Sequence, residues 1–273
     1  MNRGRRYADL FGRLEAAGEG GLIPFVMLGD PDPGRSLDLV RTIVAAGADA
    51  LELGIPFSDP IADGPVIQAA AARALAAGTS RTDCWRIIRA IRAERPGLPI
   101  GLLVYANLVC HRDPGEFYAE AAAAGADSVL VADLPVGEAG QVAAAARARG
   151  IAPVFIAPPN ADESRLGAIA AAGEGYTYVT SREGVTGADR ELRRDQSALI
   201  ARLRELGAPP PVMGFGISNP GQVRAALAMG AAGVISGSAV VAQVASGGDL
   251  RSFIQEMKAA TINPGRPAPG GLH

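Results

Sequence analysis

Two carboxylates eleven positions apart, Glu52 and Asp63, are the side chains of this 273-residue chain best suited to chemistry. Glu52 stands between Leu51 and Leu53 in a short apolar run, so a strand here turns the leucines to one side and the carboxylate to the other. Burying an unpaired carboxylate costs free energy or raises its pKa. Asp63 follows in a loop, residues 55–65, that three prolines stiffen. The two residues therefore form a candidate acid/base pair.

Each carboxylate also has a plainer interpretation. Glu52 could form a salt bridge with an arginine of the same sheet, although the strand-like runs of the chain contain no arginine. Asp63 precedes Gly64-Pro65, which is a common position for a turn residue or a helix N-cap. The residues alone leave both interpretations open.

The counts of other reactive residues exclude several kinds of enzyme. Lysine occurs once, at Lys258 near the C-terminus and far from both carboxylates, which leaves a Schiff-base mechanism without an amine. Histidine and cysteine occur twice each, at His111, His273, Cys84 and Cys110. Only Cys110 and His111 are adjacent, and nothing nearby completes a set of metal ligands. The sequence thus predicts no metal site, no disulfide scaffold, and chemistry that depends on carboxylates.

Charge and hydropathy exclude two classes of partner. The chain has 26 Lys+Arg against 28 Asp+Glu and a formal net charge of -2. It therefore lacks the excess of positive charge that is typical of proteins that bind nucleic acid or an anionic membrane. The longest uncharged stretch, residues 225–248, is diluted by Gly, Ser and Gln, which favours a helix end, a strand and a helix start over a membrane span. The N-terminus lacks the apolar core of a signal peptide. We expect a soluble cytoplasmic protein.

Short apolar runs alternate with alanine-rich helical patterns along the whole chain. The expected strands are residues 22–28, 48–53, 100–105, 128–132, 152–156, 176–180, 212–215 and 233–236. The expected helices between them are residues 36–46, 66–77, 115–124, 138–149, 163–171, 190–206 and 220–228. Two further helical patterns, residues 7–17 and 81–94, lie before the first strand and within the second crossover.

Eight strand–helix units in about 250 residues predict a (β/α)₈ TIM barrel with an extra N-terminal helix and an additional helix in the second crossover. The alternative, an open doubly wound sheet, usually carries a G-x-G-x-x-G motif after its first strand, and residues 29–34 contain none. Residues 1–260 are expected to form one barrel domain. Residues 261–273 are dense in Pro and Gly and are expected to be a disordered tail.

The loops that follow the later strands carry further candidate features. Residues 214–218 and 236–239 are glycine turns after strands seven and eight, where barrels commonly bind phosphate with backbone amides. Residues 181–190 form a polar loop that is either a mobile lid or a plain surface loop. Asp30 and Asp133 also follow strands and are expected to be turn residues.

The segment LELGIPFSDPIADGP at residues 51–65 closely resembles the signature of the tryptophan synthase alpha chain family. Six shorter segments are also similar to the family, at residues 24–26, 101–107, 158–161, 175–178, 184–187 and 214–218. The similarity extends to about residue 258 and shows no departure at a functional position. It implies a lyase that cleaves indole-3-glycerol phosphate into indole and glyceraldehyde 3-phosphate by a retro-aldol reaction, without metal or Schiff base.

The resemblance also implies a role for each site residue. Asp63 would accept a hydrogen bond from the indole N–H and stabilise the positive charge that grows as C3 is protonated. Glu52 would deliver that proton and then remove one from the glycerol hydroxyl. The implied phosphate amides belong to Gly187, Gly216, Gly237 and Ser238. The implied indole slot consists of Phe25, Leu103, Tyr105, Tyr178, Phe215 and Ile235. The Thr186 hydroxyl would bond to Asp63 when the lid closes.

Members of the family pair with a beta chain that holds pyridoxal phosphate and consumes the indole, in an α2β2 assembly, while the alpha chain has no cofactor. The segments 56–60 and 133–135 match the family's contacts with that partner. Three alternatives remain: another phosphate-binding barrel enzyme, a non-catalytic subunit that activates a beta chain, and a stand-alone lyase. The 51–65 motif disfavours the first and the intact carboxylates disfavour the second.

Overall fold

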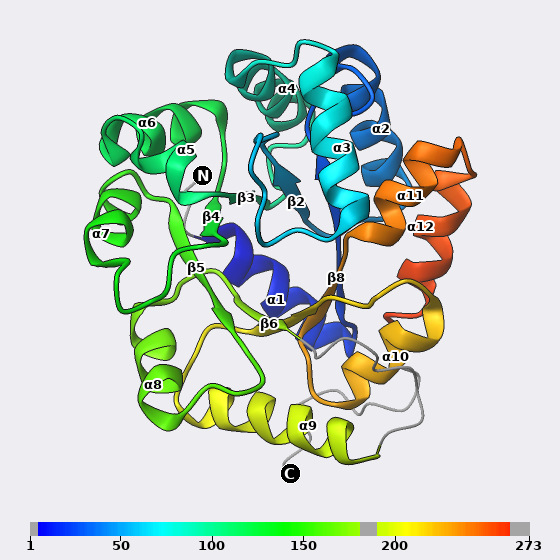
Figure 1. The fold of residues 1–273 in the computed structure, drawn as a ribbon. Helices are drawn as coiled ribbons and strands as arrows, with labels where there is room; N and C mark the ends of the chain where they lie inside the picture. Colours follow the sequence, from blue (N-terminus) through cyan, green and yellow to red (C-terminus); the bar gives the residue numbers. More distant parts are fainter. Residues whose placement is uncertain (1–4, 181–189, 263–273) are drawn as a thin grey trace.

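The computed structural model describes residues 5–180 and 190–262 of the chain. Eight parallel strands close into a barrel in sequence order, as the sequence predicts (Figure 1). The strands are β1 (Gly21–Met27), β2 (Leu51–Gly54), β3 (Ile100–Val104), β4 (Ser128–Val131), β5 (Ala152–Ala157), β6 (Thr177–Thr180), β7 (Pro211–Gly214) and β8 (Gly233–Ser236). Each expected strand is present, and its ends agree with the prediction to within a few residues.

Helices surround the barrel (Figure 1). Those that match the expected crossovers are α2 (Pro33–Ala45), α3 (Pro65–Ala76), α6 (Pro114–Ala124), α7 (Gly140–Ala148), α8 (Glu163–Ala172), α9 (Arg190–Glu205) and α10 (Pro220–Ala228), and α11 (Ser238–Ser246) follows β8. The two extra helices are confirmed as α1 (Arg6–Ala17) and α4 (Arg81–Glu94). The structure adds α5 (Ala106–Cys110), whose single turn is too short for a periodic pattern, and α12 (Leu250–Ala259).

The two faces of the barrel strands are buried in different surroundings. Leu51 and Leu53 point outward and belong to a cluster with residues of α2 and α4. The inner face of the barrel forms a second cluster, which the first helix joins through its own apolar face. Figure 1 shows α1 lying across the barrel axis. Because α1 closes the N-terminal end of the barrel, the C-terminal ends of the strands are left for a site.

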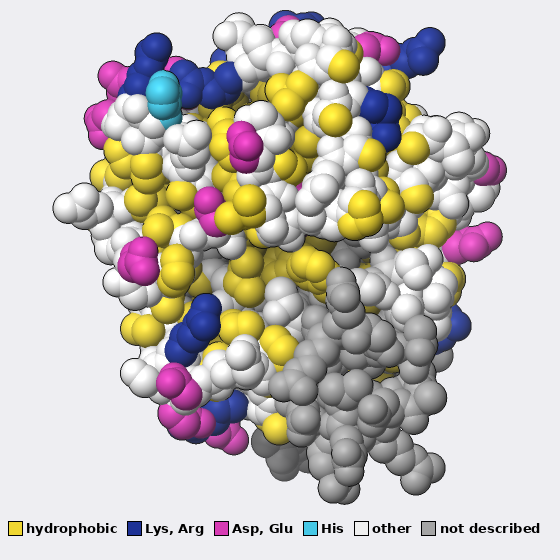
Figure 2. Space-filling view, viewed as in Figure 1, with side chains coloured by type: hydrophobic (Ala, Val, Ile, Leu, Met, Phe, Trp, Pro, Cys, Tyr) yellow, Lys and Arg dark blue, Asp and Glu magenta, His cyan; other side chains and the backbone are white. Residues whose placement is uncertain are grey.

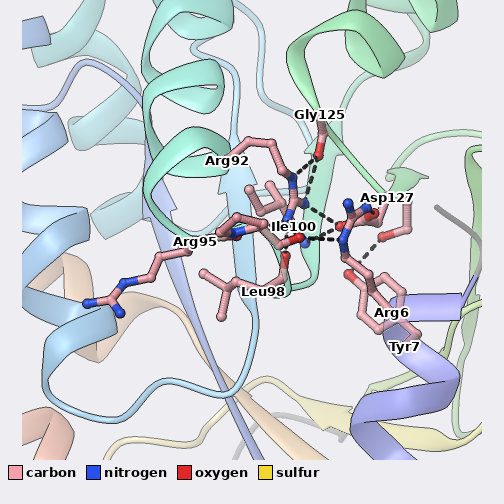
Figure 3. A network of polar contacts seen from close by, with 10 residues as sticks. Arg6, Tyr7, Arg92, Arg95, Leu98, Ile100, Gly125 and Asp127 are labelled. Carbon is pink, nitrogen blue, oxygen red and sulfur yellow. Dashed lines mark hydrogen bonds and ion pairs between the residues drawn. The ribbon is translucent and has the colours of Figure 1, made fainter. Parts of the chain in front are cut away.

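A polar network fastens the closed end (Figure 3). Asp127 directly precedes β4, and its fully buried carboxylate pairs with Arg6 at 2.5 Å and with Arg92 at 2.6 Å. The backbone amide of Ile100 donates a third hydrogen bond to it at 2.8 Å. Guanidinium groups from α1 and α4 and a backbone amide from β3 thus stabilise the negative charge of Asp127. A buried charge needs such partners to offset its loss of hydration.

The single lysine also lies at this end. Lys258 of α12 pairs with Asp49 at 2.9 Å and with Glu19 at 3.2 Å, which confirms that it is remote from the predicted site. Residues 261 and 262, the first two of the expected tail, still belong to the fold. Thr261 is buried, and Ile262 forms an isolated antiparallel β-bridge with Glu19. The rest of that tail, residues 263–273, lies outside the described residues.

The described residues contain neither a membrane-spanning helix nor a cluster of metal ligands. No helix within residues 5–180 and 190–262 is long and apolar enough to cross a membrane. Within the same ranges, no three His, Cys, Asp or Glu side chains cluster in a way that could hold a metal ion. Cys84 is buried and Cys110 is exposed, and neither forms a disulfide.

Candidate active site

Glu52 lies inside the barrel, as the alternation in β2 predicts. Its side chain is 1% exposed, and its Oε1 accepts a hydrogen bond of 2.7 Å from the Tyr176 hydroxyl. Burial raises the pKa of Glu52 to about 7, and the charge of Asp63 acts in the same direction, while the Tyr176 hydrogen bond opposes both. A carboxyl group with a pKa near neutrality can both give and take a proton at working pH.

The salt-bridge interpretation of Glu52 is wrong. Among the described residues, no arginine, lysine or histidine forms an ion pair with this carboxylate. Its neighbours across the sheet are Phe25 of β1 and Gly101 of β3, which offer no charge. The carboxylate is therefore buried with a phenol as its hydrogen-bond partner, and the described residues place no cation beside it.

Asp63 lies half-buried in the loop between β2 and α3. Its backbone amide donates to the carbonyl oxygen of Pro60 at 3.1 Å, and its carbonyl oxygen accepts from Gln68 Nε2 at 2.8 Å. The N-cap of α3 is Gly64, and no side chain caps this helix, so the interpretation of Asp63 as a helix cap is wrong. These backbone bonds fix the loop and do not involve the Asp63 carboxylate.

Tyr105 organises the same loop. Its hydroxyl accepts a 3.1 Å hydrogen bond from the Ala62 amide, and its ring stacks on Phe57 with 5.5 Å between centroids. Burial raises the pKa of Asp63, and a hydrogen bond with the Tyr105 hydroxyl opposes that rise. Tyr105, expected only as part of an apolar slot, therefore also positions the Asp63 carboxylate.

The other expected slot residues come from four different strands and one loop. Phe25, Leu103, Tyr178 and Ile235 share the inner cluster of the barrel with Tyr176. Burial raises the pKa of the Tyr178 phenol, and the charges of both Glu52 and Asp63 raise it further. Both carboxylates therefore lie near the Tyr178 phenol, which belongs to the same inner cluster as the apolar residues.

Two glycines that the sequence did not single out as spacers make room for this slot. A Cβ on Gly54 would lie 2.7 Å from the Phe25 ring, and a Cβ on Gly214 would collide with the Tyr178 hydroxyl. Any larger residue at either position would displace an aromatic side chain of the slot. Each glycine leaves room for an aromatic side chain of the adjacent strand. The sequence of a single strand does not reveal such a contact.

The predicted phosphate loops lie at the ends of β7 and β8. Phe215 and Gly216 have φ angles of 66° and 73°. For Phe215, which is 48% exposed, this left-handed conformation costs on the order of 1–3 kcal/mol. Gly237 is the N-cap of α11 and Ser238 is its first residue. The first amides of a helix have no partner within it and favour an anion.

The remaining two predicted residues, Thr186 and Gly187, lie outside the described residues. The hydrogen bond between Thr186 and Asp63 stays a prediction. The contact between the Gly187 amide and the phosphate also stays a prediction.

Figure 2 shows hydrophobic side chains gathered around the centre of this face of the molecule. A barrel with an apolar centre, two carboxylates of raised pKa and glycine loops at the C-terminal ends of its strands is typical of (β/α)₈-barrel enzymes, and the carboxylates are candidates for acid/base chemistry.

Comparisons with known proteins identify the family. The family model described as tryptophan synthase alpha chain matches residues 11–265. The chain is 55% identical to the tryptophan synthase alpha chain of Shewanella oneidensis over 264 residues, covering 94% of this chain and 95% of that one. It is 53% identical to the alpha chain of Pectobacterium atrosepticum, covering 94% and 98%. The chain belongs to the tryptophan synthase alpha chain family and is a lyase of tryptophan biosynthesis, which confirms the resemblance.

Solved structures give the same result for the fold. The tryptophan synthase subunit alpha of Legionella pneumophila superposes with a TM-score of 0.84 at 30% identity, covering 96% of this chain and 98% of that one. A chain of Mycobacterium tuberculosis tryptophan synthase gives 0.86 at 30% identity, covering 94% and 98%.

Tyr176 and Asp30 have side-chain partners that the sequence did not reveal. Tyr176, the partner of Glu52, stands two positions before Tyr178, and the period of a strand places both phenols on one face. Asp30 ends a turn, as expected, because its amide donates to the carbonyl oxygen of Met27 at 3.2 Å, and its buried carboxylate also pairs in bidentate fashion with Arg73 at 2.8 Å. Asp133 has a structural role in its loop, as expected, because its Oδ1 accepts a 2.7 Å hydrogen bond from the Ala106 amide.

Proposed function

We propose that this chain cleaves indole-3-glycerol phosphate with Glu52 as general acid and base and Asp63 as the partner of the indole nitrogen. The observation that carries these roles is the buried Glu52 carboxyl, whose pKa is about 7 and which has no cation partner among the described residues. Family membership supports the reaction, and the buried position of Glu52 supports its proposed role.

Protonated Glu52 would first deliver its proton to C3 of the indole ring. The ring then carries a positive charge on its nitrogen, and the ionised Asp63 stabilises that charge through the indole N–H. Glu52, now a carboxylate, would next take the proton of the hydroxyl on the adjoining glycerol carbon. The C–C bond breaks, its electron pair returns to the ring, and indole and the aldehyde are released. Glu52 ends the cycle protonated, as it began.

The substrate would bind in two halves. The indole ring would occupy the slot of Phe25, Leu103, Tyr105, Tyr178, Phe215 and Ile235. The phosphate would accept hydrogen bonds from the amides of Gly187, Gly216, Gly237 and Ser238. Thr186 would bond to Asp63 when the loop closes over the substrate.

The chain would work with a beta chain in an α2β2 assembly in the cytoplasm. Pyridoxal phosphate would belong to that beta chain, and the alpha chain would use no cofactor. The segments 56–60 and 133–135 would contact that partner, as the family resemblance implies.

The Glu52→Gln variant tests the proposed chemistry. We expect it to bind substrate but to release indole at least about 10²–10⁴-fold more slowly, since the amide can neither give nor take the proton. Glu256→Gln, an exposed change on α12, is the matched control and should leave turnover unchanged. Each variant is assayed with and without a beta chain, because activity of the chain alone distinguishes a stand-alone lyase from an assembled one. Near-normal indole release by folded Glu52→Gln would contradict the proposal.

A further inference from the structure

Ser236 is the last residue of β8. Its side chain links the loop after β7 to the start of the loop after β8. Its side chain is fully buried, and its hydroxyl donates a 2.8 Å hydrogen bond to the carbonyl oxygen of Ile217. Ile217 belongs to the loop after β7, and Ser236 stands directly before Gly237 in the loop after β8.

This bond continues the contact between β7 and β8 where their pairing ends. The final register pair between the two strands joins Met213 to Val234, and β8 runs on for two more residues. The chain of β7 turns away at Phe215 and Gly216, which both have positive φ. Across this divergence, the Ser236 hydroxyl supplies a hydrogen bond from β8 to the departing loop.

The rest of the departing loop is fastened to other elements. Ser218 donates to Gln222 Oε1 from both its amide and its hydroxyl, at 2.8 Å and 2.9 Å. Asn219 caps α10 by accepting the Gln222 amide. These bonds fix the loop to α10, and the Ser236 hydroxyl hydrogen-bonds it to β8.

We propose that Ser236 is a positioning residue for the phosphate end of the substrate. By holding Ile217, it sets the separation between the Gly216 amide and the amides of Gly237 and Ser238. The side chain itself touches no ligand, because it is buried and its proton is directed at a carbonyl oxygen. The inference rests on the proposed function, which places a phosphate monoester between these two loops.

Ser128 provides a matched control within the same barrel. It is a second serine on a barrel strand, 1% exposed, and its hydroxyl is 3.0 Å from the Tyr7 hydroxyl at the closed end. Serine-to-alanine changes at the two positions remove the same group from equally buried sites. Only Ser236 adjoins the glycine loops.

The experiment titrates the wild type, Ser236→Ala and Ser128→Ala with glycerol 3-phosphate and, separately, with indole, in a calorimeter. We expect Ser236→Ala to bind glycerol 3-phosphate roughly tenfold more weakly, which corresponds to about 1.4 kcal/mol, with indole binding unchanged. In the cleavage assay the same variant should raise KM more than it lowers kcat. Ser128→Ala should bind both ligands like the wild type.

Equal glycerol 3-phosphate binding by the wild type and Ser236→Ala would overturn the inference alone. A parallel loss of indole binding would also overturn it, because it would show a general loosening of the barrel. Failure of the wild type to bind glycerol 3-phosphate would overturn the phosphate site itself. If Ser236→Ala does not fold, Ser236→Cys, which fills the position with a weaker donor, is measured by the same titrations.

Discussion

Two buried carboxylates stand at opposite ends of this barrel and are treated in opposite ways. At the closed end, Asp127 meets two guanidinium groups and a backbone amide. At the open end, Glu52 meets one phenol and apolar rings. Burial raises the pKa of both carboxyl groups, but for Asp127 the charges of Arg92 and Arg6 oppose that rise, while for Glu52 the nearby charge of Asp63 adds to it.

The difference separates a structural carboxylate from a chemical one. A paired buried charge fastens the elements that supply its partners, and it loses that role if one partner is removed. A buried carboxyl with no cation beside it destabilises the fold whenever it is ionised, which supports the proposed use of Glu52 in the reaction. The closed end of the barrel is accordingly held by ion pairs, and the C-terminal end is where the proposed reaction would take place.

The largest effect on stability is expected at the closed end. Asp127→Asn leaves Arg6 and Arg92 without their shared anion, which should lower the free energy of unfolding by about 3–5 kcal/mol. The remaining folded protein should keep its kcat/KM, because the network lies far from the site. Urea unfolding and the cleavage assay measure the two quantities. A change below about 1 kcal/mol, or a loss of activity in folded protein, would break the comparison.

Glu52→Gln should have the opposite effect on the free energy of unfolding and should stabilise the fold at high pH. The folded protein raises the pKa of Glu52 from 4.5 to about 7, so it holds this proton more tightly than the unfolded chain does. Stability from that proton is complete below the unfolded value and is lost as the pH rises through about 7. Relative to the wild type, Glu52→Gln should therefore gain about 3 kcal/mol between pH 4 and pH 8.

Unfolding curves of both proteins across this pH range provide the measurement. Glu256→Gln, on an exposed position, should show no such trend. A difference between Glu52→Gln and the wild type that stays flat with pH would mean that Glu52 is solvated or paired in the folded protein.

Much of this architecture is predictable from single segments. The alternation of Leu51, Glu52 and Leu53 gives both the strand and the inward carboxylate, because only the local period is needed. The segment 51–65 gives the family, because the motif is long and continuous.

What the sequence leaves out depends on pairs that are distant along the chain. The Tyr176 phenol reaches Glu52 across 124 positions, and the Ser236 hydroxyl reaches Ile217 across 19. The Asp30–Arg73 pair spans 43 positions, and neither residue differs locally from an ordinary turn or surface residue. Closure of the barrel creates these contacts, so no local pattern contains them.

The most direct test of the account is the protonation of Glu52 itself, followed by infrared difference spectroscopy of the wild type minus Glu52→Gln as the pH is raised. We expect the signal of a protonated carboxyl group to disappear with a midpoint at about pH 7. In Tyr176→Phe the midpoint should move higher, because the Tyr176 hydrogen bond lowers the pKa of Glu52. A midpoint at the ordinary value of 4.5 in the wild type would contradict the claim that this carboxyl group is poised to give and take a proton.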